Sequence, residues 1–162
     1  MIGKPISTAD MAAATPAVFQ GFGIPSSEAP KVLKGVGVGL IFHAALFTNL
    51  SLEIWSDQGG SPARLLATST TTWTKAQIDT QFANSYKALS VGFDFAPFAL
   101  KPGAKYHLAV RATGYTGNDT NHIGWRRLYP DNPYASAYSI TPVEARKAAV
   151  MPLEAVIFAA DA

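Results

Sequence analysis

The stretch VLKGVGVGLIFH, residues 32–43, alternates apolar side chains with glycine over most of its length. One side of an extended chain would carry the apolar residues Val36, Val38, Leu40 and Phe42. The opposite side would carry Gly35, Gly37 and Gly39, followed by Ile41 and His43. A period of two is typical of a β-strand with one buried face. We therefore predict a strand here, with an outer face that has no side chains at the glycines.

The same alternation continues on both sides of this stretch. Strands are predicted at residues 18–24, 50–57, 65–70, 89–95, 106–113, 122–129 and 153–159. Turns rich in glycine and proline separate them, such as DQGGSPA at 57–63. Seven or eight short strands with hardly any helix indicate an all-β fold. We predict an antiparallel β-sandwich of the jelly-roll type.

One or two short helices are expected beside the strands. Thr74 and Gln77 have the spacing of a capping box, which predicts a helix in the middle of the chain. Near the C-terminus, Thr141 suits an N-cap, Pro142 the first helical position and Glu144 the third position after the cap. This second pattern predicts a helix of little more than one turn.

The composition suits one domain with a substantial core. The chain has 162 residues, of which 48% are hydrophobic and only 15% are charged, against about 25% charged in a typical domain. No run approaches the ~20 apolar residues of a membrane span. The net charge of +2 comes from scattered Lys and Arg, so neither nucleic acid nor a membrane is an expected partner. With no cysteine, disulfides and thiolate chemistry are excluded.

The first residues differ in character from the rest. Residues 1–16 are poor in charge, rich in Ala, Ser and Thr, and end at Pro16. They lack the compact apolar region of an export signal, so we expect a protein that is assembled inside a cell. We predict an N-terminal arm over residues 1–16 and a single domain over 17–162.

No catalytic residue, cofactor or metal site is predicted. The common hydrolase, metalloprotease and phosphate-loop motifs are missing from the sequence, and the three histidines lie in separate segments. Asp57, Asp119 and Asp131 could supply oxygen ligands to calcium. Asp is also an ordinary turn former, and we favour that interpretation for all three.

The glycines at 35, 37 and 39 suggest a contact surface. A sheet face without side chains lets a large ring or another backbone approach closely. Trp55 is one candidate to cover Gly35, Gly37 and Gly39 within the same chain. A neighbouring subunit is the alternative, and these four residues are the predicted subunit contact.

An aromatic group near the C-terminus is the best candidate for ligand binding. It contains Trp125, Arg127, Tyr129 and Tyr134. Aromatic rings and arginine suit a sugar ring or a partner surface. A tryptophan in the core with arginines at the rim would give the same pattern.

The order of the segments resembles the jelly-roll modules of phage virion proteins and of some bacterial surface or carbohydrate-binding domains. The resemblance rests on the succession of VFQGFGI at 18–24, VLKGVGVGL at 32–40, LSLEIWSDQGGSPARLLATST at 50–70, LSVGFDF at 89–95, LKPGAKYHLAV at 100–110 and IGW at 123–125. It covers roughly residues 17–159 and implies a fold, with no catalytic residue to carry over.

The resemblance and the low charge together predict a non-enzymatic virion protein. We expect a capsid decoration protein that stabilises a phage head, or else a tail or fibre component. The expected partners are phage structural proteins such as the major capsid protein, and further copies of the chain, with a trimer as one expected state. Its expected location is the virion, assembled in the host cytoplasm. The alternative is a carbohydrate-binding module that uses Trp125, Arg127 and Tyr129.

Overall fold

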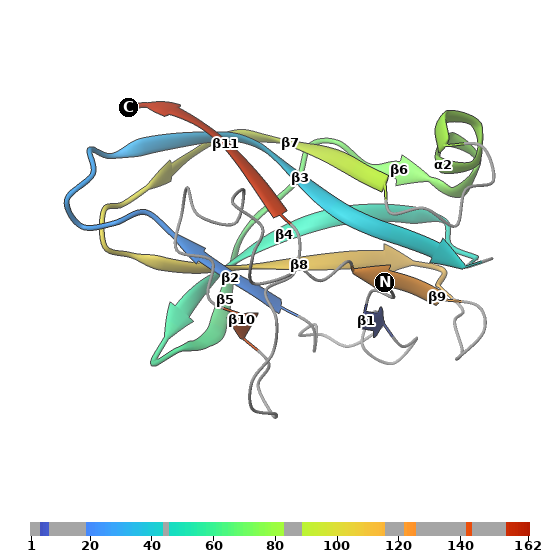
Figure 1. Cartoon of the computed structure of the whole chain (residues 1–162), viewed down its shortest axis with the longest axis horizontal. Coiled ribbons are helices and arrows are strands. Elements are labelled where there is room, and N and C mark those ends of the chain that lie inside the picture. The colour runs from blue at the N-terminus through green and yellow to red at the C-terminus, as the bar shows by residue number, and fades with distance from the viewer. Residues whose placement is uncertain are drawn as a thin grey trace, which may run out of the picture.

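The computed structural model describes residues 4–6, 19–43, 46–82, 89–115, 122–125, 142–143 and 155–162. Almost all of them belong to two antiparallel sheets, which form two layers with the core between them (Figure 1). The predicted all-β antiparallel sandwich is therefore confirmed. Its jelly-roll type stays a prediction.

The first layer, called here the β3 sheet, is built around one long strand. Its members are β1 (Lys4–Ile6), β3 (Lys31–His43), β7 (Leu89–Leu100), β9 (His122–Trp125) and β11 (Ala155–Asp161). Strand β7 pairs along one side of β3. On the other side, β11 pairs with the first part of β3 and β9 with its last four residues. Part of the predicted N-terminal arm belongs to this sheet, because β1 pairs with β9.

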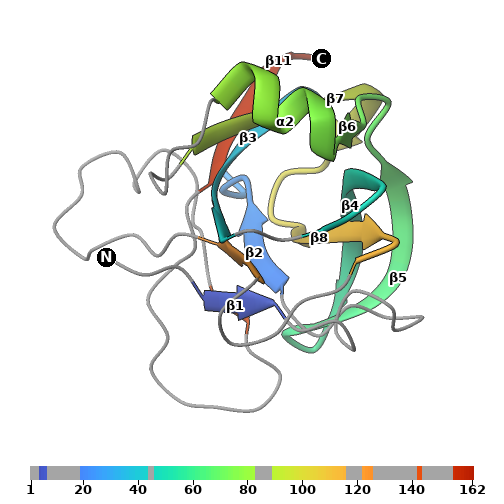
Figure 2. The same ribbon diagram turned by 90° about the vertical axis from the view of Figure 1, so that its right-hand side faces the viewer.

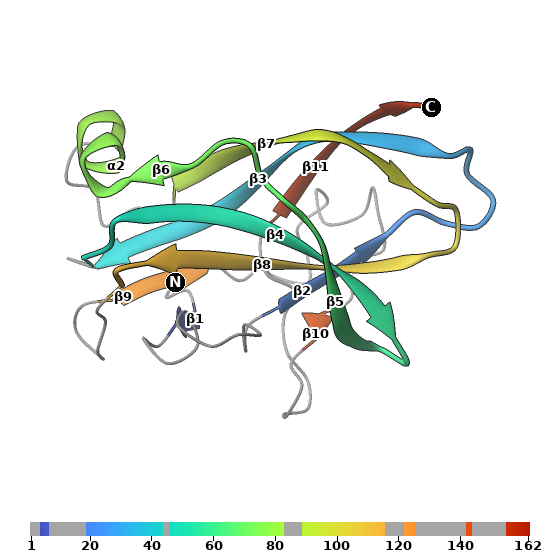
Figure 3. The ribbon, with the colours of Figure 1, turned by 180° about the vertical axis from the view of Figure 1, so that it is seen from behind.

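The second layer, called here the β8 sheet, contains the remaining strands. In spatial order these are β10 (Pro142–Val143), β2 (Phe19–Gly23), β8 (Lys105–Thr113), β4 (Asn49–Gln58) and β5 (Ser61–Thr68). The short strand β6 (Trp73–Thr74) also pairs with β4. Figure 3 shows β4 running between β8 and β5.

The core lies where the inner faces of the sheets meet (Figure 2). The alternation in the sequence predicts these faces correctly. The inward residues Val36, Val38, Leu40, Leu50, Leu52, Ile54, Val91, Phe93, Leu108 and Val110 are all buried. Their alternate neighbours therefore form the outer faces, where the candidate sites lie.

The hairpin between β4 and β5 forms at the predicted Gly-Gly turn. Gln58 pairs with Ser61, and the two residues of the loop, Gly59 and Gly60, have φ values of 64° and 86°. Two positive φ angles in succession strongly favour glycine and suit a two-residue hairpin loop. This turn fixes the position of Asp57 at the end of β4.

The helix predicted from Thr74 and Gln77 is present as α2 (Lys75–Phe82). The Gln77 N–H donates to Thr74 Oγ1 at 3.2 Å, and the Thr74 N–H donates to Gln77 Oε1 at 2.8 Å. This reciprocal pair is the predicted capping box. In the described part of the chain, no helix is long and apolar enough to cross a membrane.

The helix predicted at Pro142 is wrong for the two residues that the structure describes there. Pro142 and Val143 form β10, which pairs with Gln20 and Phe19 of β2. Proline suits a strand at the edge of a sheet as well as the first turn of a helix, and here pairing with β2 prevails over the local helix signal. Thr141 and Glu144 lie outside the described residues.

Candidate functional site

The outer face of the β8 sheet carries a second apolar cluster. It consists of Phe19 on β2, Trp55 on β4 and Ala109 on β8, all buried. The Phe19 ring meets the Trp55 ring edge-to-face, with centroids 5.8 Å apart and an interplanar angle of 82°. Such a pair adds to the stabilisation that burial gives. Trp55 therefore has an intramolecular packing role on this face.

Beside this cluster, Glu53 forms a buried charge network. Arg111 Nε donates to Glu53 Oε1 at 2.9 Å, and Arg111 Nη2 donates to Glu53 Oε2 at 3.2 Å. Trp55 Nε1 donates to the same Oε2 at 2.9 Å. Two parallel bonds from one guanidinium are the strong form of this ion pair. The network fixes Trp55 and Arg111 against each other across two strands.

A second polar pair joins β8 to the hairpin turn. His107 Nε2 lies 2.7 Å from Asp57 Oδ1, and the Gly60 N–H donates to Asp57 Oδ2 at 3.1 Å. The pKa of His107 lies below its usual 6.5, because burial disfavours the imidazolium more than Asp57 favours it. The pKa of Asp57 is also lowered, since hydrogen bonds from Gly60 and His107, with attraction to His107 and Lys105, outweigh the opposing effect of burial.

The neutral His107 ring therefore donates its Nε2–H to Asp57 and keeps a lone pair on Nδ1. Within the described residues, that buried Nδ1 has no hydrogen-bond partner. An oriented Asp–His pair is one part of a general-base arrangement. No hydroxyl of the described residues bonds to this nitrogen.

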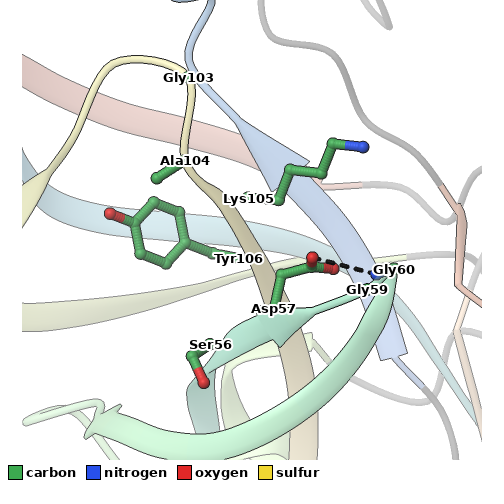
Figure 4. Close-up of a pocket in the computed structure, with 8 residues that line it drawn as sticks. All are labelled: Ser56, Asp57, Gly59, Gly60, Gly103, Ala104, Lys105 and Tyr106. Carbon is green, nitrogen blue, oxygen red and sulfur yellow. Dashed lines mark hydrogen bonds between the residues drawn. The ribbon is translucent and has the colours of Figure 1, made fainter.

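An open groove of about 650 Å³ lies at the end of the sandwich next to this pair (Figure 4). The β4–β5 turn and residues 103–106 line it. Three of its polar side chains already have partners within the protein: Asp57 accepts from Gly60, Ser56 Oγ accepts the Arg64 N–H, and the Tyr106 hydroxyl accepts the Lys101 N–H. Figure 4 shows Lys105 extending away from Asp57. The bond from Gly60 to Asp57 agrees with the interpretation of Asp57 as a turn residue.

The calcium alternative gains no further ligands from the part of the chain that the structure describes. No group of three or more His, Asp or Glu side chains converges there. Asp119 and Asp131 lie outside the described residues. Calcium coordination by these residues stays a hypothesis.

The glycine face of β3 lies on the other sheet from Trp55, so the prediction that Trp55 covers it is wrong. Strands β3 and β4 are consecutive, but they belong to different layers. Side chains of β7 and β11 lie beside the glycines instead: a Cβ added at Gly37 would lie 3.3 Å from Ser90 Oγ and 3.7 Å from the Phe158 ring. A Cβ added at Gly35 would lie 3.2 Å from the Phe93 carbonyl oxygen. Gly35, Gly37 and Gly39 are themselves buried, so residues of the same chain already pack closely around these glycines.

Trp125 is a core residue. Its side chain is 0% exposed and belongs to the cluster between the sheets. The prediction that it presents a flat surface to a sugar is therefore wrong, because the β9 pairing with β3 turns it inward. Arg127, Tyr129 and Tyr134 lie outside the described residues. The carbohydrate-binding alternative loses its leading residue.

Among the side chains that the structure describes in the β3 sheet, the most exposed large apolar ones lie on β11. Phe158 is 57% exposed and Val156 is 45% exposed. Both occupy the outer face, since they pair with Gly35 and Gly37. Among the described residues, β11 pairs with β3 only, and no described strand pairs with its far edge. At its end, Lys31 Nζ bonds to Asp161 Oδ1 at 2.6 Å.

Two juxtapositions were missed by the sequence analysis. His107 meets Asp57, and His43 lies directly opposite His122 in the pairing of β3 with β9. Each pair joins segments far apart in the chain, and no local motif marks either. Only the strand order, with β8 beside β4 and β9 beside β3, brings them together.

No protein-family model matches this chain, and searches of curated proteins and of solved structures found no significant match.

Proposed function

We propose that this protein is a non-enzymatic structural component of a phage virion. The role we favour is that of a decoration protein on the outside of the head. The second choice is a tail or fibre component. The protein would act by apolar contacts between its own copies and with the major capsid or tail protein. It would be located in the virion, after assembly in the host cytoplasm.

The observation that carries the proposal is the surface of β11. A soluble monomer usually protects an edge strand with Lys or other charged residues, or with Pro. Residues 155–160 have no charge and no proline, and they expose Val156 and Phe158. The strand has one irregularity, a register shift after Phe158. An unprotected apolar edge of this kind is expected where another subunit docks.

The low charge of the chain agrees with a covered surface. Interface cores are poor in charged residues, and only 15% of this chain is charged. The segments that carry the resemblance to phage jelly-roll modules lie in β2, β3, the β4–β5 hairpin, β7, β8 and β9. A decoration protein that binds only the assembled shell stabilises that shell by mass action.

The test is to look for the protein in the particle. Particles of the phage whose genome carries this coding sequence would be banded on a density gradient and analysed by mass spectrometry. We expect peptides of this chain at a stoichiometry comparable to that of other head or tail proteins. Light scattering of the purified protein should show an oligomer, such as a trimer. Absence from the particle would overturn the proposal.

A further inference from the structure

The edge strands that the structure describes differ in how they are protected against pairing with another chain. Proline cannot donate a hydrogen bond to a neighbouring strand, so it protects an edge. One proline lies in each of β1, β5, β7 and β10, at positions 5, 62, 97 and 142. Strand β6 has only two residues. Strand β11 has seven residues without proline, and Asp161 at its end is its only charged residue.

The segment that follows β5 also covers the side of β7 that faces away from β3. The Thr70 N–H donates to the Asp94 carbonyl at 2.8 Å, and the Asp94 N–H donates to Thr71 Oγ1 at 3.1 Å. Trp73 Nε1 donates to the Gly92 carbonyl at 2.8 Å. Within the described residues, β11 has neither a proline nor a bonded cover of this kind.

These bonds also show which groups of β11 point to its far edge. In an antiparallel ladder, the N–H and C=O of one residue point to the same side, and the side alternates along the strand. Asp94 directs both groups away from β3, so its Cα partner Gly35 directs both of its groups toward β11. Phe158, the partner of Gly35 on β11, therefore points toward β3. Its neighbours Ile157 and Ala159 direct their N–H and C=O groups to the far edge.

The side chains of β11 are apolar on both faces of the sheet and are incompletely covered. On the outer face, Phe158 is 57% exposed and Val156 is 45% exposed. On the inner face, Ile157 and Ala159 are only partly buried where they pack against the core. A further strand beside β11 would cover apolar surface on both faces and would bond to the main-chain groups of Ile157 and Ala159.

We propose that β11 pairs with β11 of a second copy of the chain, antiparallel and about a two-fold axis at Phe158. This inference rests on the proposed function, since it names the partner of the surface on which that function depends. Phe158 is the middle residue of β11, so this register pairs all seven residues of the strand. Opposite residues lie on the same face, so Ile157 lies beside Ala159 of the partner subunit. The β3 sheets of the two copies then form one continuous sheet.

Charge is the reason to choose a second copy as the occupant. A strand that pairs with itself brings its own residues together, so like charges near the axis would repel. Residues 155–160 carry no charge. Asp161 lies opposite Ala155 of the partner subunit in this register, and Lys31 Nζ of its own chain binds its carboxylate at 2.6 Å. The strand therefore meets the charge requirement for pairing with its own copy.

The experiment uses the full chain in solution. Analytical ultracentrifugation should show a dimer that dissociates on dilution, because a two-fold contact closes with two copies. Hydrogen exchange at residue resolution should show the amides of Ile157 and Ala159 exchanging more slowly in the dimer than in the diluted monomer. A protein that stays monomeric at millimolar concentration, or that forms only trimers, would overturn the proposal. A dimer without added protection at these two amides would also overturn it, because its contact would lie elsewhere.

Phe158→Lys and Phe158→Glu test the position of the axis. Residue 158 of each copy faces its own counterpart there, so either variant places two like charges opposite each other. Each variant should weaken the dimer by at least about tenfold. An equimolar mixture of the two variants should restore the dimer, because the charges are then opposite. Folded variants that do not pair when mixed would contradict the proposed register and overturn the proposal.

Leu65→Lys is the matched control. Leu65 is 44% exposed and lies on β5, an edge strand of the opposite sheet, so the same charge should leave the dimer unchanged there. Circular dichroism shows whether each variant is folded. If the Phe158 variants do not fold, Val156→Lys decides, because it replaces apolar surface at the same edge with a charge and should weaken the dimer. An unchanged Val156→Lys dimer would overturn the proposal.

Failure of the self-pairing and failure of the virion role give different results. A chain that is monomeric in solution but present in phage particles would overturn the pairing and leave the proposed function in place. If exchange at Ile157 and Ala159 slows only on attachment to heads, the occupant is a strand of a capsid protein, which also overturns the pairing. A chain that forms the expected dimer but is absent from particles would overturn the proposed function alone.

Discussion

Asp57 and His107 lie on neighbouring strands, and the Asp57 carboxylate accepts a hydrogen bond from His107 Nε2 over 2.7 Å. The His107 side chain is 1% exposed, whereas Asp57 reaches the surface at the hairpin turn. The second oxygen of the same carboxylate accepts the Gly60 N–H. One carboxylate therefore connects a buried histidine to the turn that begins β5.

This pair predicts a loss of stability in mild acid. The pKa of His107 is lowered from 6.5 by folding, mainly through burial, so between the two values the unfolded chain holds the additional proton. The free energy of unfolding is therefore highest where His107 is neutral in both states. It decreases as the pH falls below 6.5, until the pH has passed the lowered pKa of the folded protein. Asp57, with a pKa lowered from 3.8, adds a further loss only below that pH.

The measurement is urea unfolding at pH 7.5 and at pH 5.5 for the wild type and for His107→Gln. Glutamine can still donate to Asp57 but does not titrate, and all other titratable residues are the same in both proteins. The free energy of unfolding of the wild type should fall more between the two pH values than that of the variant. Equal falls would show that His107 does not cause the acid sensitivity.

The Glu53 network and the Lys75–Asp79 pair test how far burial decides the contribution of an ion pair. The Glu53 side chain is 8% exposed, while the partners on α2 are 32% and 54% exposed. Removing one partner of a buried pair typically costs about 3–5 kcal/mol, and removing an exposed i,i+4 pair about 0.3–0.5 kcal/mol.

We therefore expect Glu53→Leu to lower the free energy of unfolding by about 3 kcal/mol, near the lower end because Arg111 is partly exposed. Lys75→Ala, the matched control, should lower it by no more than about 0.5 kcal/mol, although its Nζ–Oδ2 distance is shorter, at 2.6 Å. Urea unfolding at pH 7 measures both. Equal effects would show that burial is not the deciding factor.

The sequence predicts the strands well because each strand has one buried face. The alternation around Val36, Leu52 and Leu108 correctly identifies three core faces, and the capping box at Thr74 correctly identifies the helix. The segment at Pro142 shows where this reasoning ends. A local helix signal can be overridden when the segment pairs with the edge of a sheet, and nothing local reveals that pairing.

The candidate sites are harder to predict because they depend on which strands become neighbours. Alternation places Trp55 on the minor face of its strand, but it does not say which sheet that strand joins. In the same way, His43 and His122 look isolated until β9 is found beside the end of β3. Strand order depends on packing over the whole chain. The alternation within one strand therefore gives little information about which strands become its neighbours.

Trp125 offers a direct test of its assignment to the core. Trp125→Ala should lower the free energy of unfolding by about 3–5 kcal/mol, as expected for a large buried aromatic side chain. Phe158→Ala is the control, because this side chain is 57% exposed and its loss should change stability by about 0.5 kcal/mol or less. Urea unfolding distinguishes the two. A stable Trp125→Ala variant would return this residue to the surface and reopen the carbohydrate-binding interpretation.

Gly92 is a position at which the outer face of the β3 sheet can be altered without disturbing the fold. This residue pairs with Gly37 across β7 and β3, and a Cβ added there would meet no atom of the described residues within 4 Å. Gly92→Lys therefore adds a charge to the face without strain. Folding stability should be unchanged or slightly higher, because a larger residue has less conformational freedom in the unfolded chain.

If this face contacts another subunit, Gly92→Lys should reduce the oligomeric mass measured by light scattering and weaken attachment to the particle. The reason is that a buried interface disfavours an unpaired charge. Ala63→Lys is the matched control, since Ala63 is exposed on β5 of the opposite sheet. A folded Gly92→Lys protein that assembles and attaches like the wild type would exclude the glycine face as the contact and leave the edge of β11 as the surface to alter next.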